Sequence, residues 1–495
     1  MFKIDSKNVK LNKEEFLETI RDMMNKGIKI HDLDKMYEDT IEKFNAKKDE
    51  ISSKYNIENP SSPKQLQYYL QSLHRAEVMS ACTINRKFTT GAEALRKLSI
   101  LGYEFGDDMI EFRNLDSIRK AIKQLVENVD SENYIRPTAT LGRTNRVQYS
   151  KPALLSLPKD MLWDLIAPRE DGQKIWSVDI KNQEPNIIAN IKNCQEIKDR
   201  LGGSLYEKMF EWCYGPKAKL TVVVFNCNEI SVINNEDIAK MTSNEELYAP
   251  YRINEQFKYD GYSVKAAYPK CISCPIGTKL TEDKLPKTVK IYADMIGCVE
   301  AHVKWNLEHR DEERLGVFSI DGEITDIALE LDSNVRKEFK TSWNALTYGQ
   351  TKAGLVSMCK NIDANVLWDK FNSIDGLKNW RNNCNKIARQ GGNVVVHSYF
   401  GEAMYPDGYN SSAIARQIMD YEVQGTGADI LELLVRNFNK KNSSDIEIYY
   451  TRHDELILLA GKETNDEEVG KILKELFEHQ VDDWRPFEVE IRRVV

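Results

Sequence analysis

The sequence has 495 residues, of which 41% are hydrophobic and 29% are charged, a balance typical of a globular chain with room for two to four domains. The net charge of −8 argues against a protein that coats nucleic acid without specificity, although a local cationic groove can still bind phosphates. No apolar stretch reaches membrane-spanning length, the first residues resemble no targeting signal, and the nine cysteines are scattered. We therefore expect a cytoplasmic protein without disulfides and without a membrane partner.

The first 130 residues predict helices. Apolar residues recur at three- and four-residue spacing in 11–24, 65–79 and 117–129. Pro, Gly, Ser, Thr and Asn gather in 56–65 and 87–94, where we expect the helices to be interrupted and capped. An α-rich lobe follows from this pattern.

The remaining chain mixes strands and helices. A basic segment, 138–152, predicts a loop or an irregular strand, and a β-like block follows at about 215–325, which we interpret as an insertion. Strands are predicted by the apolar runs 175–180, 446–450 and 456–460. Later helices are predicted over 332–349, 364–374, 376–390 and 411–438. The expected fold class is therefore mixed, α+β.

Two acids lie where apolar strands end. Asp179 is near the end of 175–180, and Asp454 lies in the polar turn between 446–450 and 456–460. Mg²⁺ is held in proteins by few carboxylates together with substrate phosphates, so two such acids could hold two ions that clamp both oxygens of a phosphoryl transfer. Either acid alone is more often a solvated turn residue, so the interpretation depends on other motifs.

Four residues spaced four apart, Arg336, Lys340, Asn344 and Tyr348, predict one face of a helix. Such a face can direct two cations to a triphosphate and a ring to a base, and Gly349 leaves space for close approach. An exposed helix with ordinary surface cations gives the same pattern. The order of all the motifs has to decide between the two interpretations.

In that order, the motifs resemble those of the family A DNA polymerases, the bacterial DNA polymerase I type. DIKNQE at 179–184 resembles motif A, RKEFKTSWNALTYG at 336–349 resembles motif B, and TRHDEL at 451–456 resembles motif C. The resemblance covers nearly the whole chain, because further segments match the family at 59–66, 88–98, 142–158, 398–406 and 416–430. The implied function is template-directed addition of deoxynucleotides to a primer 3′ end by two-metal phosphoryl transfer.

The resemblance also implies roles for single residues. The implied catalytic and metal-binding groups are Asp179, the backbone of Ile180, Asp454, the supporting acid Glu455 and Lys340. The implied nucleotide-binding residues are Arg336, Lys340, Asn344, Tyr348, Gln183 and Glu184. Glu184 would pack under the sugar and exclude a 2′-hydroxyl. The implied DNA contacts are Arg146, Arg416, Gln424 and His453.

The cofactors implied by the resemblance are two Mg²⁺ ions, with Mn²⁺ as a substitute. The implied partners are primer–template DNA and deoxynucleoside triphosphates, and the setting is a bacterial cell or a phage-infected host. A short form, encoded by a phage or a mobile element, is one origin that fits. The insertion has no family counterpart of its length, and we expect it to contact template, displaced strand or a processivity partner.

The resemblance implies a right-hand polymerase with thumb, palm and fingers, whose palm is built on an antiparallel sheet. The expected boundaries are 1–135 for a thumb-like lobe, 136–214 for palm with motif A, 215–325 for the insertion, 326–395 for fingers with motif B, and 396–495 for palm with motif C. Because the thumb pattern starts near residue 12, we expect no exonuclease domain and no proofreading.

Several positions depart from the family pattern. Asn344 stands where the family has Phe or Tyr, and Asp420 stands where an Asn is usual. Pro185 and Asn186 replace the usual end of motif A, which carries an Arg. Asn344 could bind a 3′-hydroxyl, or it could leave a looser pocket in which Trp343 supplies some packing. The sequence does not rank these two alternatives.

Two other functions were weighed. A single-subunit RNA polymerase resembles this family in its palm and in its Lys and Tyr-Gly helix, but an acid at Glu184 is tied to rejection of ribose. A non-catalytic DNA-binding remnant would not need Asp179, Asp454, Lys340 and Arg336 together. The polymerase is therefore the preferred interpretation.

Two patterns in the insertion are weaker. Asp321 and Glu323 superficially resemble an exonuclease Asp-x-Glu, but a solvated turn is the expectation. A zinc site at Cys271 and Cys274 would need further ligands from Cys227, Cys298, His302 or His309. Because no second paired spacing accompanies this C-x-x-C, we expect reduced cysteines.

Overall fold

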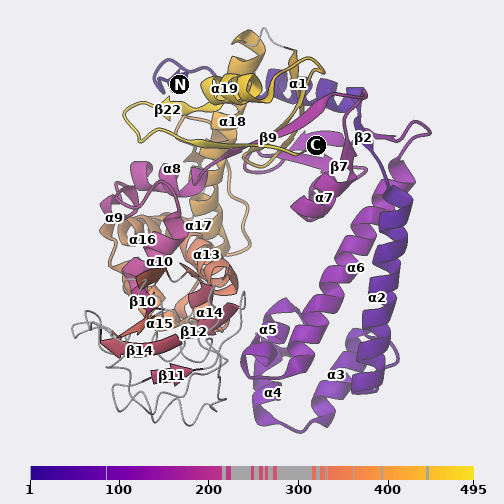
Figure 1. The fold of residues 1–495 in the computed structure, drawn as a ribbon, viewed down its shortest axis with the longest axis vertical. Helices are drawn as coiled ribbons and strands as arrows, with labels where there is room; N and C mark the ends of the chain where they lie inside the picture. The colour runs from indigo at the N-terminus through magenta and orange to yellow at the C-terminus, as the bar shows by residue number, and fades with distance from the viewer. Residues whose placement is uncertain are drawn as a thin grey trace. The chain divides into compact units, whose positions relative to one another are not determined.

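The computed structural model describes residues 2–84, 86–214, 333–360, 362–391, 394–441 and 445–494, together with the backbone of short strands between 219 and 331. It contains two compact units (Figure 1). The first unit comprises Met1–Leu205, Ala345–Met358 and Trp368–Val495. The second unit comprises Tyr206–Asn344 and Cys359–Leu367. The five-part division expected from the motifs stays a prediction.

Helices dominate the first 130 residues, as the apolar spacing predicted. They are α1 (Lys13–Lys26), α2 (Leu33–Tyr55), α3 (Pro63–Ser72), α4 (Ala76–Ala81), α5 (Ala92–Ile100) and α6 (Glu104–Asn128). The long helices α2 and α6 lie side by side, and α5 packs on α6 (Figure 1). Their shared core includes Ile51, Leu98 and Phe112.

The helical pattern over 65–79 is divided into two helices. α3 begins with Pro63 after Ser62, whose side chain accepts a hydrogen bond from the amide of Gln65. It ends at Ser72, and His74 has a left-handed backbone with φ of 49° before α4 begins. A single left-handed residue is enough to break the helix, and periodicity alone does not reveal it.

A four-stranded antiparallel sheet forms the centre of the first unit. Its order is β20 (Ile446–Arg452), β21 (Glu455–Ala460), β9 (Lys174–Ile180) and β23 (Val489–Arg493). All of β21 and most of β9 are buried, which fits two central strands with near-continuous apolar sequence. The prediction of a mixed α and β fold with an antiparallel sheet is therefore confirmed.

Smaller strand pairs complete this unit. The segment predicted as a loop or irregular strand is a hairpin of β6 (Thr138–Leu141) and β7 (Val147–Ser150). The remaining strands are β1 (Phe2–Ile4), β2 (Ile28–Ile30), β3 (Thr83–Ile84), β4 (Lys87–Phe88), β5 (Tyr134–Ile135), β8 (Ile166–Ala167), β18 (Val396–His397), β19 (Ala403–Met404) and β22 (His479–Val481).

Helices with bounds that lie in the first unit connect these strands. They are α7 (Lys159–Leu165), α8 (Gln183–Ile191), α9 (Gln195–Lys198), α14 (Lys352–Val356), α16 (Asp375–Gln390), α17 (Ser411–Asp420), α18 (Thr426–Lys441) and α19 (Asp466–Phe477), with a 3₁₀ turn at Leu154–Ser156. A π-helical segment, Tyr421–Gly425, joins α17 to α18 within the run predicted as one helix. Such segments occur often at functional sites.

The second unit holds most of α10 (Leu205–Tyr214) and α13 (Ser333–Thr347) and the start of α15 (Ala364–Asn372). Its strands are β10 (Lys219–Val223), β11 (Leu247–Ala249), β12 (Gln256–Tyr259), β13 (Tyr262–Lys265), β14 (Cys271–Pro275), β15 (Leu315–Phe318), β16 (Ile324–Ala328) and β17 (Glu330–Leu331). They form a five-stranded sheet, β11-β14-β15-β10-β16, and a three-stranded sheet, β12-β13-β17.

Some predictions for the insertion fall outside the described residues. These are the ligands of the zinc site, the acids at 321 and 323, and the partner-binding surface. Among the cysteines whose side chains are described, Cys82, Cys194, Cys359 and Cys384 are free thiols. No helix in the described ranges is both long and apolar enough to cross a membrane.

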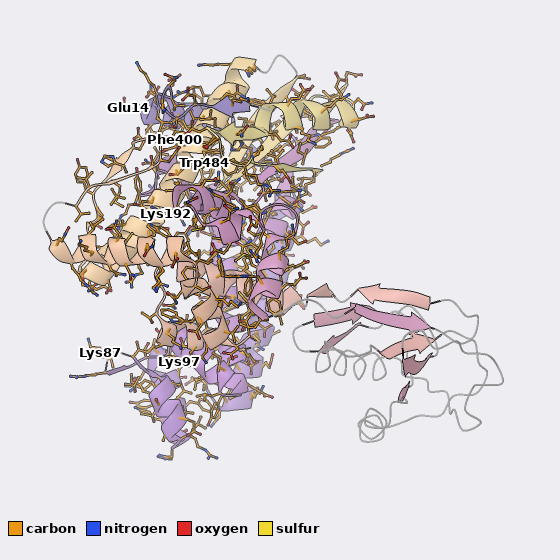
Figure 2. The ribbon with its side chains drawn as sticks, turned by 90° about the vertical axis from the view of Figure 1, so that its left-hand side faces the viewer. Glu14, Lys87, Lys97, Lys192, Phe400 and Trp484 are labelled. Carbon is orange, nitrogen blue, oxygen red and sulfur yellow. The ribbon has the colours of Figure 1, made fainter. Side chains whose placement is uncertain are left out.

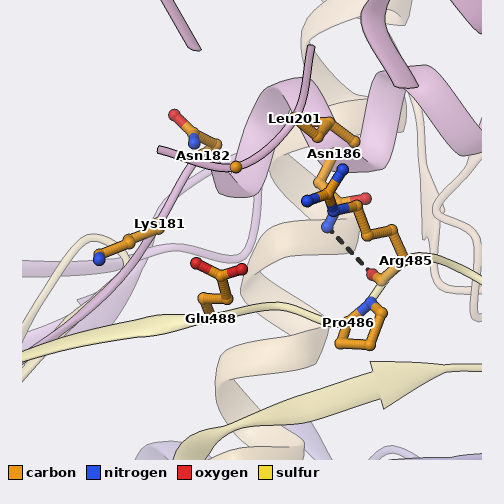
Figure 3. Close-up of a pocket in the computed structure, with 8 residues that line it drawn as sticks. Lys181, Asn182, Asn186, Leu201, Arg485, Pro486 and Glu488 are labelled. Atoms are coloured by element: carbon orange, nitrogen blue, oxygen red, sulfur yellow. Dashed lines mark hydrogen bonds between the residues drawn. The ribbon is translucent and has the colours of Figure 1, made fainter. Parts of the chain in front are cut away.

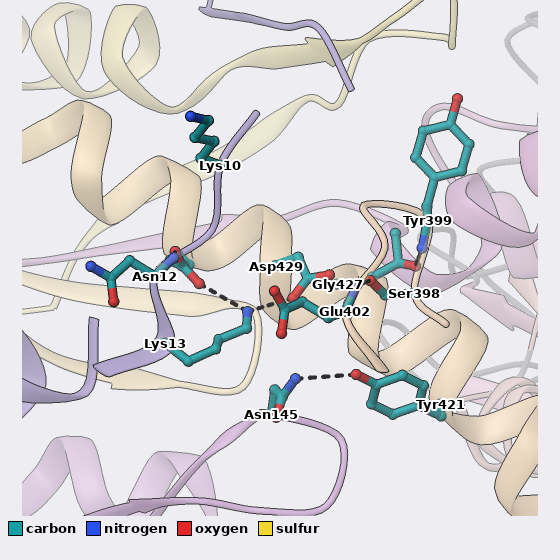
Figure 4. Close-up of polar contacts among 12 residues, drawn as sticks. Lys10, Asn12, Lys13, Asn145, Ser398, Tyr399, Glu402, Tyr421, Gly427 and Asp429 are labelled. Carbon is teal, nitrogen blue, oxygen red and sulfur yellow. Dashed lines mark hydrogen bonds and ion pairs between the residues drawn. The ribbon is translucent and has the colours of Figure 1, made fainter. Parts of the chain in front are cut away.

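A buried charge cluster attaches the N-terminal segment to α18. The Nζ atom of Lys13 pairs with the carboxylate of Asp429 and lies 2.9 Å from Oε2 of Glu432 (Figure 4). The backbone amide of Asn12 donates to Oε1 of Glu432 at 2.7 Å. Both carboxylates are at most 1% exposed; Lys13 compensates Asp429 and shares Glu432 with Arg436, whose Nη2 lies 2.8 Å from Oε1 of Glu432.

Replacing Lys13 with methionine should lower the free energy of unfolding of the first unit by about 2–3 kcal/mol, because the buried Asp429 loses its cation and the buried Glu432 keeps only Arg436. The matched control is Lys26→Met, whose pair with Glu447 is exposed and should contribute less than about 1 kcal/mol. Urea unfolding curves measure both losses. Equal losses in the two variants would contradict the buried-pair explanation.

Candidate active site

The predicted acids are positioned by two neighbouring central strands. β9 ends at Ile180 just after Asp179, and β20 turns into β21 through His453 and Asp454. His453 has a left-handed backbone with φ of 56°, which an ordinary residue adopts only where a tight turn demands it. The turn therefore presents Asp454 at the same end of the sheet as Asp179.

The register places further carboxylates beside Asp179. Glu455 on β21 and Glu490 on β23 are both directly opposite Asp179 in the antiparallel ladder. Directly opposite residues share a face, with Cβ atoms roughly 4.5–5.5 Å apart. Glu455, Asp179 and Glu490 thus form a row across three strands, with Asp454 next to its first member.

This concentration of like charges affects Asp454. Burial, and next the neighbouring Asp179 carboxylate, raise the pKa of Asp454 to about 6. The carboxylate is therefore held in a place where its negative charge lacks full compensation. A divalent cation between Asp179 and Asp454 would relieve that cost.

One protein cation reaches the row. Nζ of Lys159, the first residue of α7, lies 2.7 Å from Oε1 of Glu455 and 3.2 Å from Oδ2 of Asp179. The hydroxyl of Ser177 donates to the same Glu455 oxygen. Glu455 is therefore occupied by two protein donors.

The donor set fits Mg²⁺. No group of three or more His, Cys, Asp or Glu residues is arranged as a ready metal site in the part of the chain that is described. Mg²⁺ does not need one, because it usually takes one or two carboxylates and keeps waters or substrate phosphates. Asp179 and Asp454 would supply those two carboxylates. The amide of Ile180, the third predicted contributor, donates to the carbonyl of Asp454 at 3.4 Å.

Glu184 is clasped by two predicted site residues. Nη2 of Arg146 lies 2.6 Å from its Oε1, and the hydroxyl of Tyr348 donates to its Oε2 at 2.5 Å. Burial and the Glu184 carboxylate hold the pKa of Tyr348 well above its usual value, so the phenol stays a donor. The Glu184 carboxylate has a fixed orientation as a result.

Four more of the predicted residues lie in the turn after α13, on α17, in the π-helical segment and in the turn between β20 and β21. Gly349 has φ of 88°, and a Cβ there would meet the side chains of Met419 and Arg416 at 2.7 and 3.1 Å, so the glycine is required. Arg416 is exposed on α17, and Gln424 is partly exposed in the π-helical segment. His453 is exposed at its turn.

Asp420, at the end of α17, is a partly buried acid near the clasp. Burial, together with the Glu184 carboxylate, raises its pKa to about 6, while Arg146 opposes this shift.

Gln183, for which the resemblance implies nucleotide binding, is a buried residue of α8. It is 3% exposed and donates to the carbonyl of Gly427 at 3.4 Å, so it holds α8 to α18.

The π-helical segment is held by contacts of its Glu422 side chain with Lys192, the residue after α8, and with Trp380 on α16. Oε2 of Glu422 accepts hydrogen bonds from Lys192 Nζ and Trp380 Nε1, each at 2.5 Å. Nζ of Lys192 also lies 5.0 Å from the centre of the Trp380 ring. Figure 2 labels Lys192. These contacts fix the segment that carries Gln424.

In the second unit, α13 and α10 place the other predicted nucleotide-binding residues together. Nζ of Lys340 lies 5.2 Å from the ring centre of Tyr206, and Tyr206 donates to Oδ1 of Asn344 at 3.3 Å. Nε of Arg336 lies 3.7 Å from Oε1 of Glu207. Arg336 and Lys340 are both exposed, so they can reach a ligand from this unit.

Sequence reasoning missed several residues that touch the predicted site, among them Glu490, Ser177, Lys159 and Tyr206. Lys159 reaches Asp179 and Glu455 from a helix that carries no motif, and its only local signal is Trp163 one helical turn later. Tyr206 lies on a helix that carries no motif either. Only the tertiary fold brings such residues to a site.

A pocket lies at the turn that follows Asp179 (Figure 3). It is lined by Lys181, Asn182, Asn186, Leu201, Gly202, Arg485, Pro486 and Glu488. Nδ2 of Asn186 donates to the carbonyl of Arg485 across it at 3.2 Å. Its volume of about 10 Å³ accommodates roughly one water molecule, so it is not a nucleotide pocket.

Comparison with known proteins gives one sequence relative and a related fold. The relative is the DNA polymerase I of Aquifex aeolicus (strain VF5), 28% identical over 157 residues, which are 29% of this chain and 26% of that protein. No family model matches the chain. The chain thus spans about a quarter of its curated relative.

The related fold is the polymerase domain of Pol1 from M. smegmatis, solved in complex with DNA primer-template and dNTP. The TM-score is 0.62 at 17% identity, and the match covers 97% of this chain and 69% of that one. This likeness shows a shared fold. Together the two comparisons confirm the resemblance to family A DNA polymerases that the motifs predicted.

The buried acid Asp420 should make stability depend on pH. Its folded pKa of about 6 exceeds the unfolded value, so its contribution to stability is fully present below about pH 4 and is lost as pH rises through 6. Asp420→Asn removes this dependence. At pH 8 the variant should be more stable than wild type by about 1–2 kcal/mol, and the difference should vanish near pH 4.

Urea unfolding of both proteins between pH 4 and 8 measures the Asp420 effect. The matched control is Asp407→Asn, because Asp407 is exposed and pairs with Arg143 at 2.9 Å at the surface. Its difference from wild type should stay below about 1 kcal/mol across the range. A pH-independent effect of Asp420→Asn would contradict the assigned shift.

Proposed function

We propose that this chain, which resembles family A DNA polymerases in sequence and fold, is a template-directed DNA polymerase that adds deoxynucleotides to a primer 3′ end. The observation that carries the proposal is the pair Asp179 and Asp454 at the end of two hydrogen-bonded strands, next to the clasped Glu184. The related Pol1 domain is a complex with primer-template and dNTP, which supports the same partners here.

In this proposal Asp179 and Asp454 hold two divalent cations, Mg²⁺ or Mn²⁺. The cations would neutralise charge on the reacting phosphate and orient the attacking and leaving oxygens. The backbone of Ile180 is proposed as a further metal contact by resemblance. Glu455 acts as a supporting acid, because Lys159 and Ser177 already occupy one of its oxygens.

The other nucleotide contacts are proposed by resemblance. Arg336 and Lys340 are proposed to bind the triphosphate, and Lys340 to donate a proton to the leaving group. Arg336 would exchange its pair with Glu207 for a phosphate, a small cost because the arginine is 44% exposed. Tyr348 is proposed to lie near the template base pair.

The DNA contacts are proposed for exposed or partly exposed groups near the clasp and the turn. They are Arg146, Arg416, Gln424 and His453. Donors of this kind, from Arg and from the Gln side chain, are those that bind phosphates and base edges.

Asp179→Asn should lower the rate of primer extension by on the order of 10³-fold, because a neutral amide cannot replace a carboxylate that binds the cations. Affinity for the primer–template should stay within about threefold. The matched control is Asp164→Asn on α7, an exposed acid away from the row.

Gel-based primer extension and fluorescence anisotropy measure these two quantities on one defined template with Mg²⁺. Wild type that folds and binds primer–template but never extends it would favour the non-catalytic remnant. Extension that survives in Asp179→Asn would refute the assignment of this acid.

Glu184→Ala should raise the incorporation of ribonucleotides relative to deoxynucleotides by about 10–100-fold. The clasp by Arg146 and Tyr348 gives Glu184 a fixed position, and removing its side chain leaves room for a 2′-hydroxyl. The control is Glu196→Ala on α9, which no described contact links to the site.

Single-nucleotide incorporation with each sugar measures the ratio of kcat/KM values. Wild type that extends with ribonucleotides as readily as with deoxynucleotides would move the proposal to an RNA polymerase. A ratio unchanged in Glu184→Ala would show that another residue excludes ribose.

A further inference from the structure

Lys159 occupies a place in the carboxylate row that no motif assigns. Its Nζ atom lies 2.7 Å from Glu455 and 3.2 Å from Asp179, and it packs 4.7 Å from the ring centre of Trp163. Arg492 also packs on that ring, at 4.0 Å. Lys159 and Trp163 are one turn apart on α7. The Trp163 ring therefore limits the positions of the Lys159 amine and keeps it beside the carboxylate row.

The two contacts of Lys159 are unequal. The Glu455 side chain is only 4% exposed, and it also accepts from Ser177. The Asp179 side chain is 37% exposed, and its contact with Lys159 is the longer one. A metal ion arriving from solvent can therefore displace Lys159 from Asp179 while Glu455 keeps its contacts with Lys159 and Ser177.

We propose that Lys159 is a positioning residue of this site, which holds Glu455 through a lasting ion pair and competes with the incoming divalent cation for Asp179. The inference rests on the proposed function and extends it to the metal affinity of the site. The positive charge of Lys159 beside the row weakens the binding of a metal ion. The same charge stabilises the carboxylates when no metal ion is bound.

When no metal ion is bound, the folded state should depend on the Lys159 amine to offset the charges of the carboxylate row. Without Lys159, Asp179, Asp454, Glu455 and Glu490 form a row of acids to which no other described side-chain cation is paired. Their mutual repulsion destabilises the folded chain until a divalent cation binds. Metal binding and thermal stability therefore report on Lys159 without any reference to catalysis.

The test is Mn²⁺ titration of the full chain without DNA, in which electron paramagnetic resonance detects free Mn²⁺. Lys159→Met should bind Mn²⁺ about three- to tenfold more tightly than wild type, because one competing charge is removed. Lys159→Arg, which keeps the charge, should stay within about twofold of wild type. Lys159→Gln provides the neutral variant if methionine impairs folding.

The matched control is Lys174→Met at the other end of β9. Lys174 pairs with Asp466 at 2.7 Å and, like Lys159, is mostly buried, with 20% of its side chain exposed. Its loss should leave the Mn²⁺ affinity unchanged. A gain in affinity in this control equal to that of Lys159→Met would overturn the proposal, because net charge alone would explain it.

Thermal unfolding supplies the second measurement. In EDTA, Lys159→Met should melt several degrees below wild type, and saturating Mg²⁺ should close most of that gap. Neutral variants that bind Mn²⁺ no more tightly than wild type would overturn the role of Lys159. Wild type that binds Mn²⁺ but extends no primer would instead refute the proposed function and leave this result intact.

Discussion

The concentration of like charges at one end of the central sheet is the constraint on which the site depends. Strand pairing places Glu455 and Glu490 on either side of Asp179, and the turn at His453 adds Asp454. Burial, and next the repulsion from the Asp179 carboxylate, raise the pKa of Asp454 to about 6. The sheet is stable enough to hold them because its two central strands are almost entirely buried.

The protein answers this repulsion with one described side-chain cation, Lys159, which pairs with Asp179 and Glu455. Glu184 is different, because Arg146 and Tyr348 hold both of its oxygens and leave it little freedom to move. Asp179, which is proposed to bind a metal ion, thus has one long ion pair within the described part of the protein. Glu184, which is proposed to exclude a 2′-hydroxyl by its position, is held at both oxygens.

The strands and most helices could be predicted because their physical cause is local. An apolar run such as 175–180 has to be buried, and an acid next to its end has to meet solvent or a cation. The left-handed His74 that divides α3 from α4 leaves no comparable pattern, nor does the π-helical segment before α18. In both places tertiary packing overrides a helical periodicity that continues through the break.

The site was predictable only in part for the same reason. Asp179, Asp454 and Glu184 lie within motifs whose spacing can be read, so their positions followed from the sequence. Lys159 acts across a sheet from a separate helix, and its role depends on the length of its side chain and on the Trp163 ring beneath it. Such a contact is set by packing between elements, which one sequence does not specify.

The departure at Asn344 has a physical explanation within the second unit. Where the family has an aromatic residue, Asn344 instead accepts a hydrogen bond from the Tyr206 hydroxyl. The Tyr206 ring lies beside the ammonium group of Lys340. An aromatic surface is therefore still present on this face of the unit, but α10 supplies it in place of α13. A ring anchored by a hydrogen bond from its hydroxyl and by a cation over its face has little rotational freedom, so it can shape the space next to Lys340 as a side chain on α13 would.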